Sequence, residues 1–221
     1  MAEKSMTRRD FLKVAGLTVG TVALASGIGC AALGDSAAKD AEPETPDFTF
    51  GEDQTMSKRI LVTYATRTGS TVGVAAAIGE TLGSRGFAVD VKPVKENPRT
   101  DGYDAIIMGS AINGGQWLPE AVEFVKNNRK ALNRVPLVLY CVHIMNLGDD
   151  EKSKQKRHAY LDAVRPLVGP VDEVWFAGLG SDPSKDSWLA RWVYRTFNIG
   201  PEGDCRDWAR IRGWAQTVPV A

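Results

Sequence analysis

Residues 59–71 read Arg-Ile-Leu-Val-Thr-Tyr-Ala-Thr-Arg-Thr-Gly-Ser-Thr, and this stretch decides the fold. Its first six residues form a short, mostly apolar run with β-branched side chains, which is typical of a buried strand. Residues 65–71 are rich in turn-forming and hydroxyl side chains. From Val72 to Leu82 the apolar residues recur at helical spacing. The sequence therefore predicts a strand, a loop and a helix in direct succession.

The same alternation of strand and helix continues to the end of the chain. Further strands are predicted at 87–93, 103–108, 137–142 and 171–179, and further helices at 119–128, 149–168, 187–199 and 204–217. Strands that alternate with helices build a parallel sheet covered on both faces. A five-stranded, doubly wound α/β domain commonly takes the strand order 2-1-3-4-5, with its ligand at the carboxyl edge between strands 1 and 3.

The loop after the first strand carries groups that suit a phosphate. Amides at the start of a helix lack an acceptor within the helix and attract an anion, and hydroxyl side chains add further donors. The loop has neither the lysine of a P-loop nor the glycines of a dinucleotide-binding fingerprint. We therefore expect a site for one terminal phosphomonoester, and a capped helix with nothing bound is the alternative. The residues concerned are Thr66, Arg67, Thr68, Gly69, Ser70 and Thr71.

The motif T-x-T-G-x-T after a first strand resembles the phosphate loop of the flavodoxin family, and the resemblance covers residues 58–219. It implies a flavodoxin-like fold with FMN as cofactor. It also implies that residues 109–117 and 142–148, which follow the third and fourth strands, lie against the two faces of the flavin ring. The further cofactor-binding residues implied are Ser110, Ala111, Ile112, Asn113, Gly114, Gly115, His143, Ile144 and Asn146.

Individual residues in these two loops have alternative interpretations. Gly114 and Gly115 lack a Cβ, so either could present a peptide group to flavin N5. Trp117 either stacks on the ring or packs under the next helix, and packing is favoured. Residues 142–148 contain no aromatic side chain for stacking, which predicts an open flavin. His143 is best interpreted as a polar loop residue without a catalytic role.

The C-terminal third resembles the menaquinone-dependent protoporphyrinogen oxidase branch of the flavodoxins. The resemblance lies in the predicted strand at 171–179, an inserted segment, and the motifs Gly-Pro-Glu-Gly-Asp at 200–204 and Arg-Asp-Trp at 206–208. It implies a quinone or a porphyrinogen-like substrate. Within the insert, the helix from Trp188 to Ile199 is amphipathic, with aromatic anchors and basic flanks. This helix either packs on the domain or faces a quinone or a membrane.

The N-terminus predicts export. Residues 7–13 read Thr-Arg-Arg-Asp-Phe-Leu-Lys, the pattern of a twin-arginine signal, and a weakly apolar run follows at 14–28. Cys30 ends a degenerate lipobox, so a lipid anchor and ordinary cleavage both stay open. We expect a signal peptide over residues 1–30, a disordered acidic linker over 31–57 and the FMN-binding domain over 58–221. The twin-arginine machinery would deliver the domain to the periplasm or the outer face of the cytoplasmic membrane.

The composition is that of an ordinary globular protein. Of the 221 residues, 43% are hydrophobic and 24% are charged, and the formal net charge is zero. Residues 58–221 hold 22 basic and 18 acidic side chains, a net charge of +4, which is too weak for a nucleic-acid surface. The three cysteines include no C-x-x-C spacing and predict neither a disulfide framework nor a zinc site.

Three functions fit this sequence. The leading hypothesis is an FMN-dependent oxidoreductase that exchanges electrons with a quinone or a porphyrinogen-like substrate. The first alternative is a one-electron carrier for a protein partner, and the second is a flavin-free binding or scaffold lipoprotein. No catalytic side chain and no metal ligand is assigned, because the sequence shows no nucleophile paired with a base and only two histidines, His143 and His158.

Overall fold

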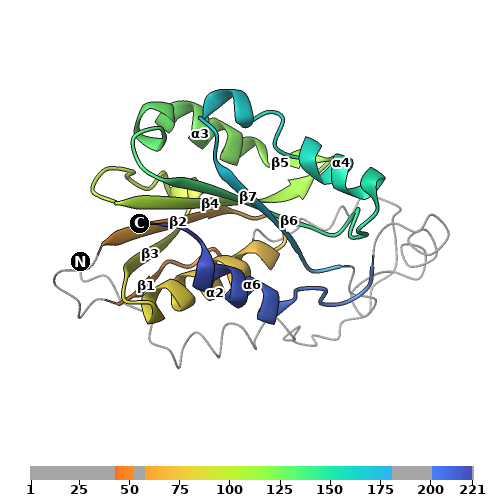
Figure 1. The fold of residues 1–221 in the computed structure, drawn as a ribbon, viewed down its shortest axis with the longest axis horizontal. Helices are drawn as coiled ribbons and strands as arrows, with labels where there is room; N and C mark the ends of the chain where they lie inside the picture. The colour runs from red at the N-terminus through yellow and green to blue at the C-terminus, as the bar shows by residue number, and fades with distance from the viewer. Residues whose placement is uncertain (1–42, 52–57, 181–200, 221) are drawn as a thin grey trace, which may run out of the picture.

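The computed structural model describes residues 43–51, 58–180 and 201–220. One sheet runs through the middle of the molecule, with helices on both of its faces (Figure 1). The strands are β1 (Phe48–Phe50), β2 (Arg59–Ala65), β3 (Ala88–Pro93), β4 (Ala105–Asn113), β5 (Gln116–Trp117), β6 (Leu137–His143) and β7 (Asp172–Ala177). The helices are α2 (Ser70–Ser84), α3 (Pro119–Leu132), α4 (Glu151–Ala159) and α6 (Trp208–Thr217), with short 3-10 turns η1 (Val94–Glu96) and η2 (Arg165–Leu167).

The strand order confirms the predicted fold class. The sheet runs β1-β3-β2-β4-β6-β7, and β5 pairs with β4 outside this path. The five strands β3, β2, β4, β6 and β7 are mutually parallel. Numbered along the chain, these five take the order 2-1-3-4-5. The carboxyl ends of β2 and β4 therefore lie side by side, which is where this topology places a ligand.

Each face of the sheet carries its own hydrophobic core. Helices α2 and α6 cover one face and α3 and α4 lie over the other (Figure 1). Because side chains alternate along a strand, Ile60, Val62 and Tyr64 of β2 face the α2 core, whereas Leu61 and Ala65 face the α3 core. Residues 60–65 of β2 are all buried between the two cores. This packing holds the strand rigidly at its carboxyl end, where it leads into the loop of residues 66–71.

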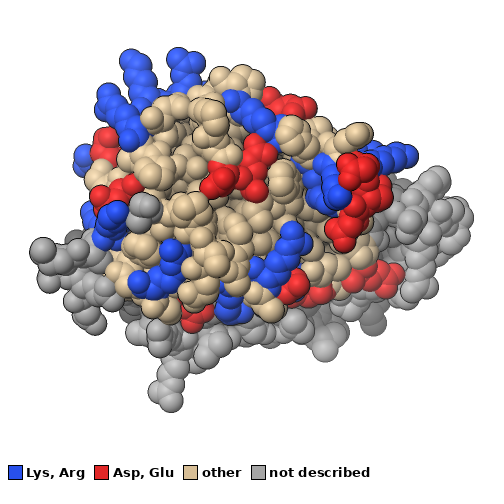
Figure 2. Space-filling model, in the orientation of Figure 1, with Lys and Arg blue, Asp and Glu red and all other residues tan. Residues whose placement is uncertain are grey.

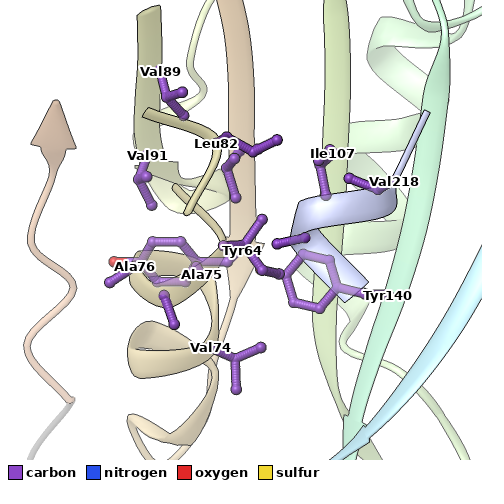
Figure 3. Close-up of a cluster of buried hydrophobic side chains, with 14 of the residues drawn as sticks. Tyr64, Val74, Ala75, Ala76, Leu82, Val89, Val91, Ile107, Tyr140 and Val218 are labelled. Atoms are coloured by element: carbon purple, nitrogen blue, oxygen red, sulfur yellow. The ribbon is translucent and has the colours of Figure 1, made fainter. Parts of the chain in front are cut away.

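A glycine in β4 makes room for the ring of a tyrosine in the neighbouring strand β6. Gly109 pairs with Tyr64 of β2 on one side and with Tyr140 of β6 on the other. A Cβ at Gly109 would lie 1.9 Å from Cζ of Tyr140, so the ring occupies the space that any other residue would need. Both tyrosine side chains lie in the buried cluster on the α2 face, among residues such as Val74 and Ile107 (Figure 3).

Two predicted helices differ from those observed. The sequence predicts one helix over residues 149–168, but α4 ends at Ala159. No residue of α4 is buried, whereas Tyr160, Leu161 and Val164 turn into the core, and Pro166 cannot donate the hydrogen bond that a longer helix needs. Helix α6 begins four residues later than predicted, at Trp208, because the Asp207 side chain accepts a hydrogen bond from the Arg210 amide and caps it. The predicted helix at 187–199 lies outside the described residues.

The prediction of a disordered linker is wrong for residues 43–51. Phe48–Phe50 form strand β1, which pairs antiparallel with β3 at the edge of the sheet. Phe48 is 4% exposed and belongs to the α2 core, so the aromatic pair in this acidic segment has enough apolar surface to hold it in place. The domain therefore includes residues that precede 58. The predicted signal peptide lies outside the described residues.

The packing of Gly109 predicts a large effect of a single methyl group. Gly109→Ala forces the Tyr140 ring out of its position, and overpacking of this kind typically costs about 1–3 kcal/mol of unfolding free energy. Gly213→Ala is the control, since a Cβ at Gly213 of α6 meets nothing within 4 Å and should be neutral or stabilising. Urea unfolding of both variants measures the difference, and equal midpoints for the two would contradict this packing.

Candidate functional site

Three segments meet at the carboxyl edge of the sheet. They follow β2, β4 and β6, which are adjacent parallel strands and therefore end at the same side. The first is the phosphate loop, defined as residues 66–71. The second is a hairpin formed by β4 and β5, and the third is the loop of residues 144–150 between β6 and α4. The structure thus brings together the three parts of the chain in which the sequence analysis placed the site.

The phosphate loop is shaped by two internal hydrogen bonds and one glycine. The Gly69 amide donates to Oγ1 of Thr66 over 3.0 Å, and the Val72 amide donates to the Gly69 carbonyl over 3.2 Å. Gly69 precedes the first residue of α2 with φ = 83°, a left-handed conformation that favours glycine. The loop therefore turns sharply from β2 into α2, which directs the first amides of the helix outward.

Several donors of the phosphate loop lack an acceptor. Within the described part of the chain, the amides of Arg67, Thr68, Ser70 and Thr71 donate to no protein atom. Oγ1 of Thr71 is also buried without a hydrogen-bond partner, and the whole residue is 0% exposed. A buried polar group without a partner is rare in a folded protein. Clustered amides and a hydroxyl at a helix N-terminus fit a phosphate, whose oxygens supply the missing acceptors.

A segment after β7 supports the phosphate loop from outside. Nη1 of Arg206 approaches the Ser70 carbonyl at 3.5 Å, and the guanidinium lies 4.4 Å from the Trp208 ring centre. Arg206 also forms a bidentate pair with Asp204, at 2.8 Å for each bond, and these hydrogen bonds lower the pKa of Asp204. Because Asp204 neutralises Arg206, the amides and hydroxyls remain the main groups for an anion.

The segment of residues 109–117 forms a hairpin, where a loop was predicted. Strand β4 continues to Asn113 and returns as β5 through a turn at Gly114 and Gly115. Their φ angles are 59° and 81°, as a two-residue type I′ turn requires at both positions. The tip residues 113–115 are exposed, and Ile112 is half-buried. The hairpin tip therefore projects from the edge of the sheet next to the phosphate loop.

Three residues at the base of the hairpin have structural roles. The Ser110 hydroxyl accepts from the Leu118 amide at 3.1 Å and donates its one proton to the Ala111 carbonyl at 2.8 Å, so it has no proton left to donate to a cofactor. Ala111 is 8% exposed. Trp117 is 3% exposed, and its Nε1 donates to Sγ of Cys141, which confirms packing over stacking. Burial raises the pKa of Cys141 to about 12, so this thiol stays protonated at neutral pH.

His143 does not project from the third loop as predicted. It is the last residue of β6, it is 5% exposed, and its ring meets Tyr160 edge to face at 5.4 Å between centres. Its Nδ1 lies 2.7 Å from the carbonyl oxygen of Met145. The pKa of His143 is lowered to about 4, mainly by burial and in smaller part by the positive charges of Arg157 and Arg210, against the opposing effect of the hydrogen bond to Met145. The imidazole is therefore neutral at physiological pH and turned into the protein.

The third loop is held by side chains of α4 and Tyr160. Asn146 has φ = 60°, and its Nδ2 donates to the Tyr160 hydroxyl at 2.7 Å. Arg157 donates to the carbonyl oxygens of Asn146 and Gly148. The Asn146 amide group is thus engaged within the protein, and Ile144 is half-buried. These contacts fix the loop backbone at the edge of the site.

The residues that the sequence analysis missed are apolar. Met145 and Leu147 of the third loop are 45% and 40% exposed, and they are the only large hydrophobic side chains so exposed within the described ranges. The sequence carries no periodic signal for them, because residues 144–147 form a bend with Asn146 in a left-handed conformation and do not extend as a strand. They give the rim of the site an apolar surface.

In the described segments, no group of three or more metal-ligating side chains occurs and no helix is long and apolar enough to cross a membrane.

Comparison with known proteins finds that this chain is similar to flavodoxins. A family model described as a flavodoxin domain matches residues 61–178. Protoporphyrinogen IX dehydrogenase (quinone) from Escherichia coli K12 is 28% identical over 99 residues, which are 44% of this chain and 55% of that protein. The same protein from Escherichia coli O157:H7 matches equally. The chain thus spans about half the length of the curated relatives it matches.

Solved structures of low sequence identity also match. Oxidised flavodoxin 1 from Bacillus cereus is 13% identical with a TM-score of 0.43, covering 57% of this chain and 88% of that one. A flavodoxin mutant from Fusobacterium nucleatum, bound to flavin mononucleotide, is 17% identical with a TM-score of 0.40, covering 53% of this chain and 68% of that one.

Burial of His143 predicts a pH-dependent stability. The folded-state pKa of about 4 lies below the ordinary value of 6.5. Between these values the unfolded chain binds a proton that the folded chain does not, so stability is complete above pH 6.5 and falls as the pH drops toward 4. The loss is about 3 kcal/mol.

His143→Phe keeps an aromatic ring beside Tyr160 and should lose less stability between pH 7 and pH 4 than the wild type. In the wild-type structure the Met145 carbonyl also accepts from the Tyr160 hydroxyl at 3.1 Å, and this bond does not involve the imidazole that the variant removes. Denaturant unfolding at both pH values measures the effect, and His158→Gln, at an exposed site on α4, is the control. A wild-type pH dependence in His143→Phe would contradict the burial argument.

Proposed function

The chain belongs to the flavodoxin domain family, and on that premise we propose that it is an FMN-dependent oxidoreductase that exchanges electrons with a quinone or a porphyrinogen-like substrate. The observation that carries the proposal is the phosphate loop, whose outward amides and buried Thr71 hydroxyl all lack acceptors. Bound flavin supplies the electron transfer, and the protein supplies binding, orientation and electrostatics. Redox chemistry of this kind needs no nucleophilic side chain.

The phosphate loop holds the FMN phosphate. A phosphomonoester carries close to two negative charges at neutral pH and has three strong acceptor oxygens. The amides of Arg67, Thr68, Ser70 and Thr71 supply donors at the positive end of α2. The Thr71 hydroxyl in the first turn of the same helix is buried without a partner, and it meets a phosphate oxygen once the loop adjusts around the ligand.

The hairpin and the third loop flank the space for the flavin ring. At the hairpin tip, Gly114 and Gly115 have no atom within 4 Å of a built Cβ, so a ligand can approach their peptide groups directly. On the other side Met145 and Leu147 offer apolar contact. Trp117 and Tyr160 are both turned into the protein. With no aromatic side chain among residues 144–150, the ring edge stays accessible to a small substrate.

A quinone is the acceptor that the sequence relatives support. The matched proteins from Escherichia coli carry "quinone" in their names, and the match covers 44% of this chain. A porphyrinogen is the second substrate class suggested by the same names. The apolar rim formed by Met145 and Leu147 suits either molecule, because both present large apolar surfaces.

The proposed location is the outer face of the cytoplasmic membrane. It rests on the twin-arginine pattern at residues 7–13 and on Cys30, both outside the described residues. The twin-arginine machinery carries folded proteins, so FMN would be bound before export. Cys30 lipidation or the amphipathic helix from Trp188 to Ile199 would then hold the domain near membrane quinones.

A one-electron carrier for a protein partner is the second candidate. The observation that favours it is the pair of exposed apolar side chains, Met145 and Leu147, since such groups commonly take part in protein contacts. The distribution of charged side chains gives the carrier hypothesis less support. Figure 2 shows Lys and Arg interspersed with Asp and Glu on the face that it draws, without one acidic field for a basic partner.

Thr71→Val tests the phosphate placement. The substitution keeps the shape and removes a buried hydroxyl that has no protein partner, so the protein without FMN should be as stable as the wild type or more stable. Loss of a hydrogen bond to a charged group weakens FMN binding by about 1.5–3 kcal/mol, which is about tenfold or more. Fluorescence titration with FMN measures the affinity.

Thr63→Val is the matched control for Thr71→Val. Thr63 also has a buried, unpartnered hydroxyl, but it lies within β2 and before the phosphate loop. This variant should bind FMN like the wild type. Equal affinities for Thr71→Val and Thr63→Val would contradict the phosphate placement.

Reoxidation of the reduced protein separates the two candidate functions. The flavin-loaded full chain is reduced and mixed with a water-soluble menaquinone analogue, and flavin absorbance follows reoxidation. An oxidoreductase for quinone reoxidises faster than free reduced FMN at the same concentration. If the protein slows the reaction instead, the carrier hypothesis replaces the quinone oxidoreductase. A colourless protein that ignores added FMN would contradict both.

A further inference from the structure

The segment that precedes the first parallel strand lies along the helix that begins at the phosphate loop. We call residues 43–50 the N-terminal strap. At one end, Cβ of Pro43 lies 3.7 Å from the position of a Cβ built on Gly69, the residue that begins the turn into α2. At the other end, Phe50 lies against Gly79 and Gly83 in the second half of α2. The strap therefore contacts the same helix near both of its ends.

Four kinds of contact hold the strap in place. Strand β1 pairs with β3, and Phe48 is buried in the α2 core. The Tyr64 hydroxyl donates to the Pro46 carbonyl at 2.9 Å. Nζ of Lys92 lies 3.4 Å from a carboxylate oxygen of Asp47. Because β1 is only three residues long, its backbone pairing alone would be weak, and these side-chain contacts supply the rest.

Helix α2 contains a groove that fits Phe50. A Cβ at Gly79 would lie 2.5 Å from Cγ2 of Val91 and 3.0 Å from the Phe50 ring, and one at Gly83 would lie 2.7 Å from Cβ of Phe50. The two glycines are four residues apart, so they lie on one face of the helix. Glycine inside a helix costs about 0.5–1 kcal/mol relative to alanine. The close approach of Phe50 accounts for glycine at position 83, and Phe50 together with Val91 of β3 accounts for glycine at position 79, despite the cost to the helix.

We propose that the N-terminal strap is a positioning element of the phosphate loop. This inference rests on the proposed function and deepens it. Tyr64, which bonds to the strap, lies two residues before Thr66, and α2 carries the amides of Ser70 and Thr71 in its first turn. Seating the strap fixes both the strand that enters the loop and the helix that leaves it. Unseating the strap releases the loop, and the phosphate loses aligned donors.

The effect of the strap is specific to the phosphate. The strap lies at the β3 edge of the sheet, whereas the hairpin and the third loop follow β4 and β6 on the other side of β2. It therefore acts on the group that anchors FMN and leaves the contacts to the flavin ring unchanged. Riboflavin has the same ring and no phosphate, so comparison of the two ligands isolates the strap's contribution.

The test uses the full chain with Phe50→Ala and, separately, Tyr64→Phe. Phe50→Ala empties the groove on α2, and Tyr64→Phe removes only the hydroxyl that bonds to Pro46. Fluorescence titration gives the dissociation constants for FMN and riboflavin. We expect FMN binding to weaken about tenfold in Phe50→Ala and several-fold in Tyr64→Phe, with riboflavin binding unchanged. Hydrogen exchange of the amides of residues 66–72 should also accelerate in both variants.

Leu132→Ala is the matched control. Leu132 is 1% exposed, ends α3 on the opposite face of the sheet and contacts neither the strap nor α2. Its truncation lowers stability without changing the ratio of FMN to riboflavin affinity or the exchange of residues 66–72 relative to the rest of the core. If Phe50→Ala and Tyr64→Phe keep the wild-type ratio and exchange, or if Leu132→Ala changes them equally, the strap proposal is wrong and the proposed function stands. A wild-type chain that binds no FMN overturns both.

Discussion

The constraint on which the site depends is the unsatisfied hydrogen-bonding capacity of residues 66–71. Four amides and the buried Thr71 hydroxyl of this loop have no acceptor in the described part of the protein. A buried donor without a partner typically costs about 1–3 kcal/mol, and within this loop that cost falls on the buried Thr71 hydroxyl, since the exposed residues Arg67 and Thr68 are open to water. A phosphate does so with charge as well as geometry, because it lies at the positive end of α2. The loop therefore exchanges some folding stability for affinity toward an anion.

The rest of the fold keeps this loop in position. Strand β2 is buried on both faces and enters the loop without freedom to tilt. Helix α2 leaves it and is packed against the sheet, α6 and the N-terminal strap. The adjacent ends of β4 and β6 then bring the hairpin and the third loop beside the phosphate loop, which defines where the remainder of the cofactor lies. In the proposed function, anchoring through the phosphate would leave the flavin ring at the rim where Met145 and Leu147 are exposed, open to a small apolar substrate.

Local signals in the sequence predicted the sheet order and the phosphate loop. The apolar run at 59–64 and the T-x-T-G-x-T motif are contiguous, so their meaning does not depend on distant residues. The strap was missed because Phe48-Thr49-Phe50 is too short for a periodic signal, and its seat on Gly79 and Gly83 is set by residues about 30 positions away. The burial of His143 depends in the same way on Tyr160. The hairpin of β4 and β5, in contrast, was predictable from local sequence. Two adjacent glycines, Gly114 and Gly115, are a known signal for a two-residue turn between paired strands.

The most direct measurement of the central claim is the nitrogen–proton correlation spectrum of the full chain during titration with FMN. The four unpaired amides, of Arg67, Thr68, Ser70 and Thr71, should shift strongly downfield as they gain a charged acceptor. The amides of Gly69 and Val72 already have acceptors in the protein and should shift much less. Saturable binding that leaves these four resonances in place, with the largest shifts elsewhere in the protein, would contradict the account.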